Sequence, residues 1–171
     1  MEDVLKQAAE YERSYTIVGR VHYIASDKFA ARNRWLGIPV VLISTVVGTT
    51  IFGTLNEDPD PKIRIAAGLL SLIGAVLAAL ETTFGYAHTA ERHKAAAARY
   101  RVIYRKLKTF RLKYSDASSE KRGEAISELE ALNKELDAIS SESPSIPDAC
   151  YDRAVRDYDL EHKPVNSRGP G

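Results

Sequence analysis

Two long runs of apolar residues without a charge dominate the pattern of the chain. The first covers 20 residues from Leu36 to Leu55, and the second covers 16 residues from Ile65 to Leu80. A helix rises about 1.5 Å per residue, so about 20 residues cross the hydrocarbon core of a bilayer. Lipid cannot hydrogen-bond a backbone, and the β-branched residues of these runs must therefore be helical as well. The pattern predicts two membrane spans, at about residues 36–55 and 63–86.

The connection between the two runs is short and rich in turn-forming residues. Residues 56–61 read Asn-Glu-Asp-Pro-Asp-Pro, and so brief a connection returns the chain as an antiparallel hairpin. Residues 35–86 are therefore expected to form a transmembrane hairpin. Pro39 is expected one turn after the start of the first span, where its missing N–H group is least harmful.

Helices are also predicted on both sides of the hairpin. Apolar residues recur at steps of three, four or seven from Val4 to Phe29, which predicts an amphipathic cytoplasmic helix over residues 1–34. No proline occurs between Lys62 and Asp116, so the second span is expected to continue into the aqueous phase as a single helix of about 50 residues. The expected fold is an all-α membrane protein in which this stem leads to a C-terminal coiled-coil-like helix.

The segment after the hairpin divides at two groups of turn residues. Residues 87–143 are expected to hold the helical stem and the coiled-coil-like helix, separated by a Ser-Asp-Ala-Ser-Ser break at 115–119. Pro144 and Pro147 then end the helical region. Residues 144–171 are expected to form a short helical turn and a disordered tail.

Apolar side chains spaced by three and four residues form a seam on the stem and on the helix that follows it. Such a seam requires a partner helix, and two arrangements satisfy it. Either the N-terminal helix packs beside the stem in the same chain, or the stems of different chains assemble. The seam exceeds what one hairpin can bury, so we expect a homo-oligomer whose contacts include Ile103, Leu107, Phe110, Ile126, Leu129 and Leu136.

The distribution of charge orients the hairpin. Basic residues flank both spans on the side of the termini, whereas the connection at 56–61 carries three acids. Positive flanks stay on the cytoplasmic side, so the hairpin is expected in the inner membrane with both termini in the cytoplasm. The whole chain has 24 Lys and Arg against 23 Asp and Glu, and a single cysteine, Cys150. These totals exclude a generally basic nucleic-acid binder, a disulfide framework and a cysteine-rich zinc module.

The sequence contains no recognisable catalytic constellation. The four histidines, His22, His88, His93 and His162, are spread over three predicted elements, and no glycine-rich phosphate loop is present. His88 and His93 are five residues apart and do not share a helix face well enough for a metal site. We therefore expect neither an enzyme nor a bound cofactor or metal.

Small and polar residues form a line along each span. On the second span the line steps by four and three residues through Ala67, Ser71, Gly74, Ala78, Glu81 and Gly85. The first span carries a counterpart at intervals of four, in Ser44 with Gly48 and in Thr45, Thr49 and Gly53. Small residues let helix backbones approach closely, so each line can be a packing seam. In an oligomer one of the lines can instead face a water-filled lumen, and the residues do not decide between these two interpretations.

Glu81 is the sharpest single feature of the spans, because a carboxylate at membrane depth is energetically costly. Such a side chain faces a bundle interior, a partner or water. Alternatively it reaches the headgroup boundary, or pairs with an interfacial base such as Arg34. Both placements stay open from the sequence.

In its layout the chain resembles the SLATT family of bacterial two-span effector proteins over roughly residues 5–140. The resemblance rests on the N-terminal run Arg20–Tyr23, on the small-residue-rich hairpin, and on the exit Ala87–His93 that leads to Tyr100 and Arg101. It implies an oligomeric pore-forming or membrane-disrupting effector of a bacterial antiviral system. Such effectors are often encoded beside a nucleotide-signal synthase or sensor.

No segment of this chain resembles a nucleotide-binding domain, so the opening signal is expected from a separate partner protein or ligand. The expected partners are thus the lipid bilayer, further copies of the chain and such a synthase or sensor, without nucleic acid. The alternative function is a non-conducting membrane anchor or scaffold whose cytoplasmic helices recruit other proteins.

Overall fold

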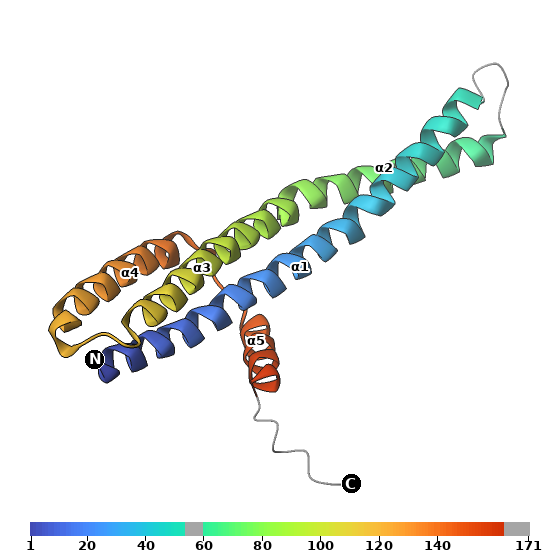
Figure 1. The fold of residues 1–171 in the computed structure, drawn as a ribbon. Helices are drawn as coiled ribbons and strands as arrows, with labels where there is room; N and C mark the ends of the chain where they lie inside the picture. The colour runs from blue at the N-terminus through green and yellow to red at the C-terminus, as the bar shows by residue number, and fades with distance from the viewer. Residues whose placement is uncertain (54–59, 163–171) are drawn as a thin grey trace, which may run out of the picture. The chain divides into compact units, whose positions relative to one another are not determined.

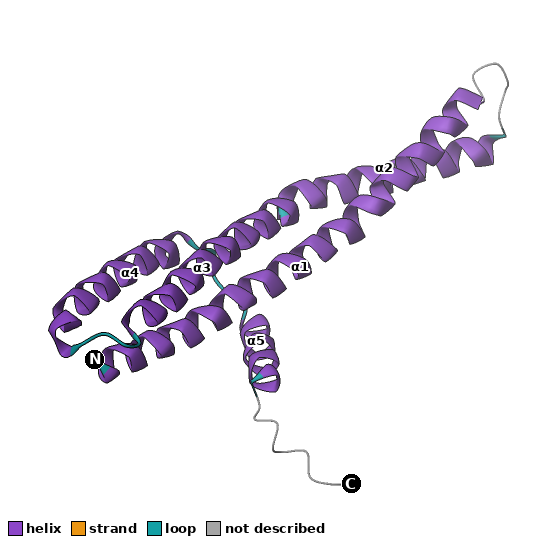
Figure 2. Ribbon diagram, in the orientation of Figure 1, coloured by secondary structure: helices purple, strands orange, loops and turns teal. Residues whose placement is uncertain are grey.

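Helices form all of the regular structure in residues 1–53 and 60–162, which are the residues that the computed structural model describes (Figure 2). The all-α prediction is therefore confirmed. The helices follow one another as α1 (Glu2–Gly53), α2 (Pro61–Phe84), α3 (Tyr86–Tyr114), the short 3₁₀ helix η1 (Ser119–Lys121), α4 (Arg122–Glu142) and α5 (Asp148–Glu161) (Figure 1).

The chain divides into two compact units. The hairpin unit is Lys28–Ala90, and the terminal unit combines Met1–Asp27 with Glu91–Gly171. Most of the turn predicted at 56–61 and of the tail predicted after α5 lies outside the described residues.

Helix α1 is a single helix of 52 residues, in which the predicted N-terminal helix and the predicted first span run together. Pro39 lies deep inside it, so its expected place in the first turn of a separate span is wrong. No glycine pair or turn sequence separates the two segments. A proline inside a membrane helix is tolerated because local adjustments satisfy the backbone groups that it frees.

The single helix of about 50 residues expected for the second span is interrupted at Gly85. This residue adopts the left-handed conformation, with φ 53° and ψ 35°, and its N–H donates to the carbonyl of Glu81. A residue without a Cβ reaches this conformation readily, and it ends α2 as a C-cap. Helix α3 then starts at Tyr86, so the expected continuous stem is two helices.

Gly85→Ala is expected to lower the free energy of unfolding by about 1 kcal/mol, because a Cβ is strained in the left-handed region. A Cβ at this position would meet no other atom within 4 Å, so strain and not collision is the cause. Gly68→Ala is the matched control, since Gly68 also lies in α2 with open space around it. In this control the free energy of unfolding should rise by up to about 1 kcal/mol, because alanine favours a helix more than glycine does. Thermal unfolding in detergent measures both, and equal stabilisation would contradict the prediction.

The hairpin unit contains two helical segments that are long and apolar enough to cross a membrane. Asp60 caps the start of α2 by accepting a hydrogen bond from the Lys62 N–H, and Pro61 occupies the first turn. Most large apolar side chains of the two segments point away from the other helix, among them Val41, Leu42, Leu69 and Leu72. Such a surface suits lipid.

The terminal unit has its own apolar core, made by the first half of α1 together with α3 and α4. Five of the six residues predicted as an oligomer seam are buried in this core, namely Ile103, Leu107, Phe110, Leu129 and Leu136. Ile126 is 39% exposed. The seam therefore finds its partner inside the chain, with Val4 and Ala8 of α1 in the same core. The seam does not require a second copy of the chain. Of the two predicted arrangements, the packing of the N-terminal helix beside the stem in the same chain is correct.

Helix α5 has 14 residues, where a short helical turn was predicted. Its Cys150 and Ala154 are buried. Two ion pairs join its end to α1. The Arg13 guanidinium lies 3.4 Å from Asp159, and Arg20 binds both carboxylate oxygens of Glu161.

Candidate functional site

The two helices of the hairpin approach each other at glycines. A Cβ built on Gly74 of α2 would lie 3.0 Å from Cγ2 of Ile43 in α1, and Gly74 is the buried residue of α2. A Cβ on Gly37 of α1 would lie 3.0 Å from the Oε1 atom of Glu81. An added Cβ at either position would therefore crowd the side chain opposite it, and the absence of one permits the close approach.

The line predicted on the second span lies mostly on the side that faces α1. Ala67, Ala78 and Glu81 are partly buried there on the same helix face as Gly74. Ser71 is exposed, and its hydroxyl donates to the Ala67 carbonyl at 2.8 Å. Gly85 belongs to the helix cap instead. The middle of this line therefore packs inside the hairpin.

The line predicted on the first span is not used in the hairpin contact. Ser44, Thr45, Thr49 and Gly53 are exposed, and Gly48 is partly buried with no neighbour within 4 Å of a Cβ. The Thr45 hydroxyl donates to the Val41 carbonyl at 2.8 Å, so its polar group is satisfied within its own helix. This line of small and hydroxyl-bearing residues stays on an open face of the hairpin.

Glu81 is partly buried against Gly37, but its carboxylate has no ion pair or hydrogen bond with any residue that the structure describes. Arg34 is exposed and does not pair with it. The pairing with Arg34, which was one of the two placements left open by the sequence, is therefore not formed. A carboxylate in an apolar hairpin without a partner in its own chain needs water or a group from another molecule.

Aromatic side chains gather near Gly85, at the end of α2. The Tyr86 ring stacks on Phe29 and on Phe84, with ring centroids 6.1 and 5.2 Å apart. The Arg32 guanidinium lies over both Phe29 and Tyr86, 5.7 and 5.8 Å from the ring centroids. Such amphipathic clusters are typical of the boundary between lipid and water.

His22 of α1 and His93 of α3 meet inside the terminal unit. Their Nδ1 atoms are 2.9 Å apart, and each side chain is about 1% exposed. One hydrogen lies between the two nitrogens, so one imidazole donates and the other accepts. Tyr100 stacks on His22 with centroids 5.5 Å apart, and its hydroxyl lies 2.9 Å from Oγ of Ser140 in α4. The cluster thus links α1, α3 and α4.

The surroundings of this pair favour uncharged imidazoles. Burial lowers the pKa of His22 from 6.5 to about 4, and the nearby His93 adds to the effect. Burial also lowers the pKa of His93, with repulsion from Arg92 as a smaller cause. Both rings are therefore neutral at pH 7.

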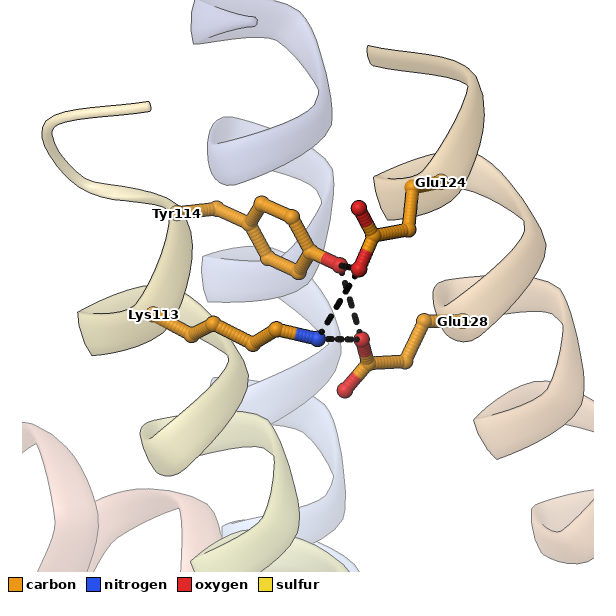
Figure 3. Close-up of polar contacts among 4 residues, drawn as sticks. All are labelled: Lys113, Tyr114, Glu124 and Glu128. Atoms are coloured by element: carbon orange, nitrogen blue, oxygen red, sulfur yellow. Dashed lines mark hydrogen bonds and ion pairs between the residues drawn. The ribbon is translucent and has the colours of Figure 1, made fainter. Parts of the chain in front are cut away.

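A second polar cluster joins the end of α3 to the start of α4. Figure 3 shows Lys113 and Tyr114 facing Glu124 and Glu128. The Lys113 Nζ lies 2.7 Å from Glu128 and 3.3 Å from Glu124, and the Tyr114 hydroxyl reaches Glu128 at 2.8 Å. Hydrogen bonds to these donors lower the pKa of both glutamates. The cluster holds α4 in place beside α3.

The pairing of His22 with His93 was not predicted, although the sequence carries a signal for it. His22 continues the spacing of Val18 and Ala25, which lie on the apolar side of α1. His93 lies seven residues before Tyr100 on the seam of α3. A histidine on each of two facing apolar stripes indicates a buried polar pair.

Among the described residues, no group of three or more His, Cys, Asp or Glu could hold a metal ion.

Two apolar helices that can cross a membrane, joined to a helical unit built from both ends of the chain, define a two-span helical membrane protein. The chain belongs to a family described as SMODS and SLOG-associating 2TM effector domain family 4, whose model matches residues 8–164. This membership confirms the resemblance to SLATT proteins and makes the chain a two-span effector of SMODS- and SLOG-associated conflict systems. No curated protein and no solved structure matches the chain.

Proposed function

We propose that this chain is a membrane-disrupting effector of a bacterial antiviral system, in which several copies assemble in the inner membrane and form a pore. The observation that carries the proposal is the Glu81 carboxylate, which has no partner among the described residues of its own chain. Assembly supplies what one hairpin lacks, because neighbouring copies can enclose water or provide a polar partner.

The open line on α1 supports assembly as well. Small and hydroxyl-bearing residues at Ser44, Thr45, Thr49 and Gly53 lie on a face that α2 does not cover. Such residues permit close contact between helices of different chains, or face a wet lumen. The buried seam of the terminal unit gives no support to assembly, because its apolar side chains are already covered.

The proposed orientation keeps both termini in the cytoplasm. It rests on the basic residues beside the spans and on the three acids of the connection at 56–61. The terminal unit would then meet its signal in the cytoplasm, from a separate synthase or sensor protein or from a ligand. The proposed action involves no catalytic step, no cofactor and no nucleic acid.

Reconstitution into liposomes tests the proposal. We expect the assembled protein to conduct cations in preference to anions, because a ring of Glu81 carboxylates concentrates cations near the mouth of the pore. Glu81→Gln keeps the shape and removes the charge, so it should reduce the cation preference by about tenfold while the oligomer stays intact. Flux is measured with and without nucleotides as the candidate signal.

Glu91→Gln is the matched control, because Glu91 is an exposed carboxylate of α3 beyond Gly85. It should leave the selectivity unchanged. An intact oligomer that conducts nothing under any condition would support the alternative, a non-conducting anchor or scaffold. The Gly74–Ile43 contact favours that alternative, because part of the small-residue line on the second span packs there against α1.

A further inference from the structure

A cavity of about 350 Å³ opens between α1 and α3 in the terminal unit. This volume lies in the range of sites that hold small molecules. Two arginines and four tyrosines dominate its lining, and these are Tyr15, Arg20, Tyr23, Tyr100, Arg101 and Tyr104. Side chains of both helices thus combine positive charge with aromatic surface.

Close packing between α1 and α3 fixes part of the cavity lining. Gly19 allows the close approach of the two helices, because a Cβ there would lie only 3.2 Å from the Cβ of Tyr100. The Tyr100 ring is buried, stacks on Tyr15 with centroids 6.2 Å apart, and also stacks on His22. The more open rings remain available to a ligand, and Tyr23 is 39% exposed.

One arginine of the cavity already holds an anion. Nη1 and Nη2 of Arg20 lie 2.9 and 2.7 Å from the two carboxylate oxygens of Glu161, at the end of α5. This two-point contact is the geometry by which arginine binds carboxylates and phosphates. Arg101, in contrast, has no hydrogen bond or ion pair with any described residue. The cavity therefore has one guanidinium that is occupied from within the chain and one that is not.

We propose that this cavity binds a small phosphate ester that carries a planar ring, and that the phosphate displaces Glu161 from Arg20. The two guanidinium groups would hold the phosphate. The exposed tyrosine faces would stack on the ring. Glu161 then acts as an internal competitor that occupies the Arg20 guanidinium while the site is empty. The proposal concerns binding alone. It can therefore fail while the pore proposal stands, and the pore proposal can fail while this one stands.

Calorimetric titration of the full chain in detergent tests the proposal, with adenosine monophosphate as the probe. Adenosine and inorganic phosphate are the two half-probes. We expect adenosine monophosphate to bind saturably and at least about tenfold more tightly than either half-probe, because only the whole molecule uses both kinds of contact. Equal affinity for phosphate and for adenosine monophosphate would overturn the proposal.

Substitutions locate the site. Arg20→Gln and Arg101→Gln should each weaken binding by about tenfold, because each removes a charged hydrogen-bond donor. Glu161→Gln should strengthen binding severalfold, because the internal competitor is gone. Tyr23→Ala should weaken binding, and Tyr23→Phe should restore it if the ring stacks.

Arg13→Gln is the matched control for these variants. Arg13 lies on the same helix and also pairs with α5, through Asp159, but it does not line the cavity. Its loss should change the affinity less than threefold. The proposal is overturned if Arg13→Gln weakens binding as much as Arg20→Gln, which would indicate unspecific attraction. It is also overturned if Glu161→Gln protein shows no saturable binding of adenosine monophosphate.

Discussion

Lowering the pH from 7 to 5 is expected to reduce the free energy of unfolding by about 2 kcal/mol through His22 alone. The folded pKa of His22 is about 4, whereas the unfolded chain titrates at the ordinary value of 6.5. Between these values the unfolded state binds more protons. The contribution of His22 to the free energy of unfolding is therefore fully present above about pH 7. It decreases as the pH is lowered and is lost below about pH 4. His93 acts in the same direction, since its pKa is lowered too.

Urea unfolding in mild detergent at several pH values between 7 and 5 measures this slope. In that window the carboxylates of Glu124, Glu128 and Glu161 stay charged, because hydrogen bonds lower the pKa of each. His22→Gln should flatten the slope. His88→Gln is the control, because His88 is an exposed histidine at the start of α3. An unchanged slope in His22→Gln would disprove the assignment of this pH dependence to the buried pair.

Gly74→Leu is expected to destabilise the hairpin by about 2 kcal/mol, because the added side chain collides with α1. Even the first carbon of that side chain would lie 3.0 Å from Cγ2 of Ile43. The two helices must then separate or rotate, which also exposes the partly buried Glu81. In the liposome assay the same variant should lose flux together with stability.

Gly68→Leu provides the control, because it adds the same side chain to the same helix where no atom lies within 4 Å. Its stability should change by less than about 1 kcal/mol. Ile43→Ala combined with Gly74→Leu should recover part of the loss, since it removes the group that collides. Thermal unfolding in detergent measures all three. Equal losses at Gly68 and Gly74 would show that the hairpin contact is not where the structure places it.

The two glycines on the second-span line illustrate how far a spacing argument reaches. Gly74 and Gly85 lie on one line of the sequence pattern, yet Gly74 packs against Ile43 and Gly85 ends a helix in the left-handed conformation. Spacing reports which residues share a helix face while the helix continues. Spacing does not show where the helix ends, because Gly85 fits the pattern and is also the residue that ends α2.

The oligomer seam shows a different limit. Three-and-four spacing predicted correctly that Ile103, Leu107 and Phe110 pack against a helix. It could not identify that helix, because an apolar stripe is equally well covered by α1 of the same chain or by a neighbouring copy. The choice depends on the loop lengths and packing of the whole unit.

The pattern of residues along the chain identifies the family and locates the two membrane-spanning segments, which are helical because long uncharged runs have few other solutions in a bilayer. It also determined the apolar faces of the remaining helices. Which of these faces meet depends on the folded arrangement of the helices. That arrangement brings His22 to His93, places Glu161 on Arg20, and leaves Glu81 without a partner among the described residues of its chain. The physical reason is that helix periodicity is local, whereas a buried polar contact depends on two helices that are distant in sequence.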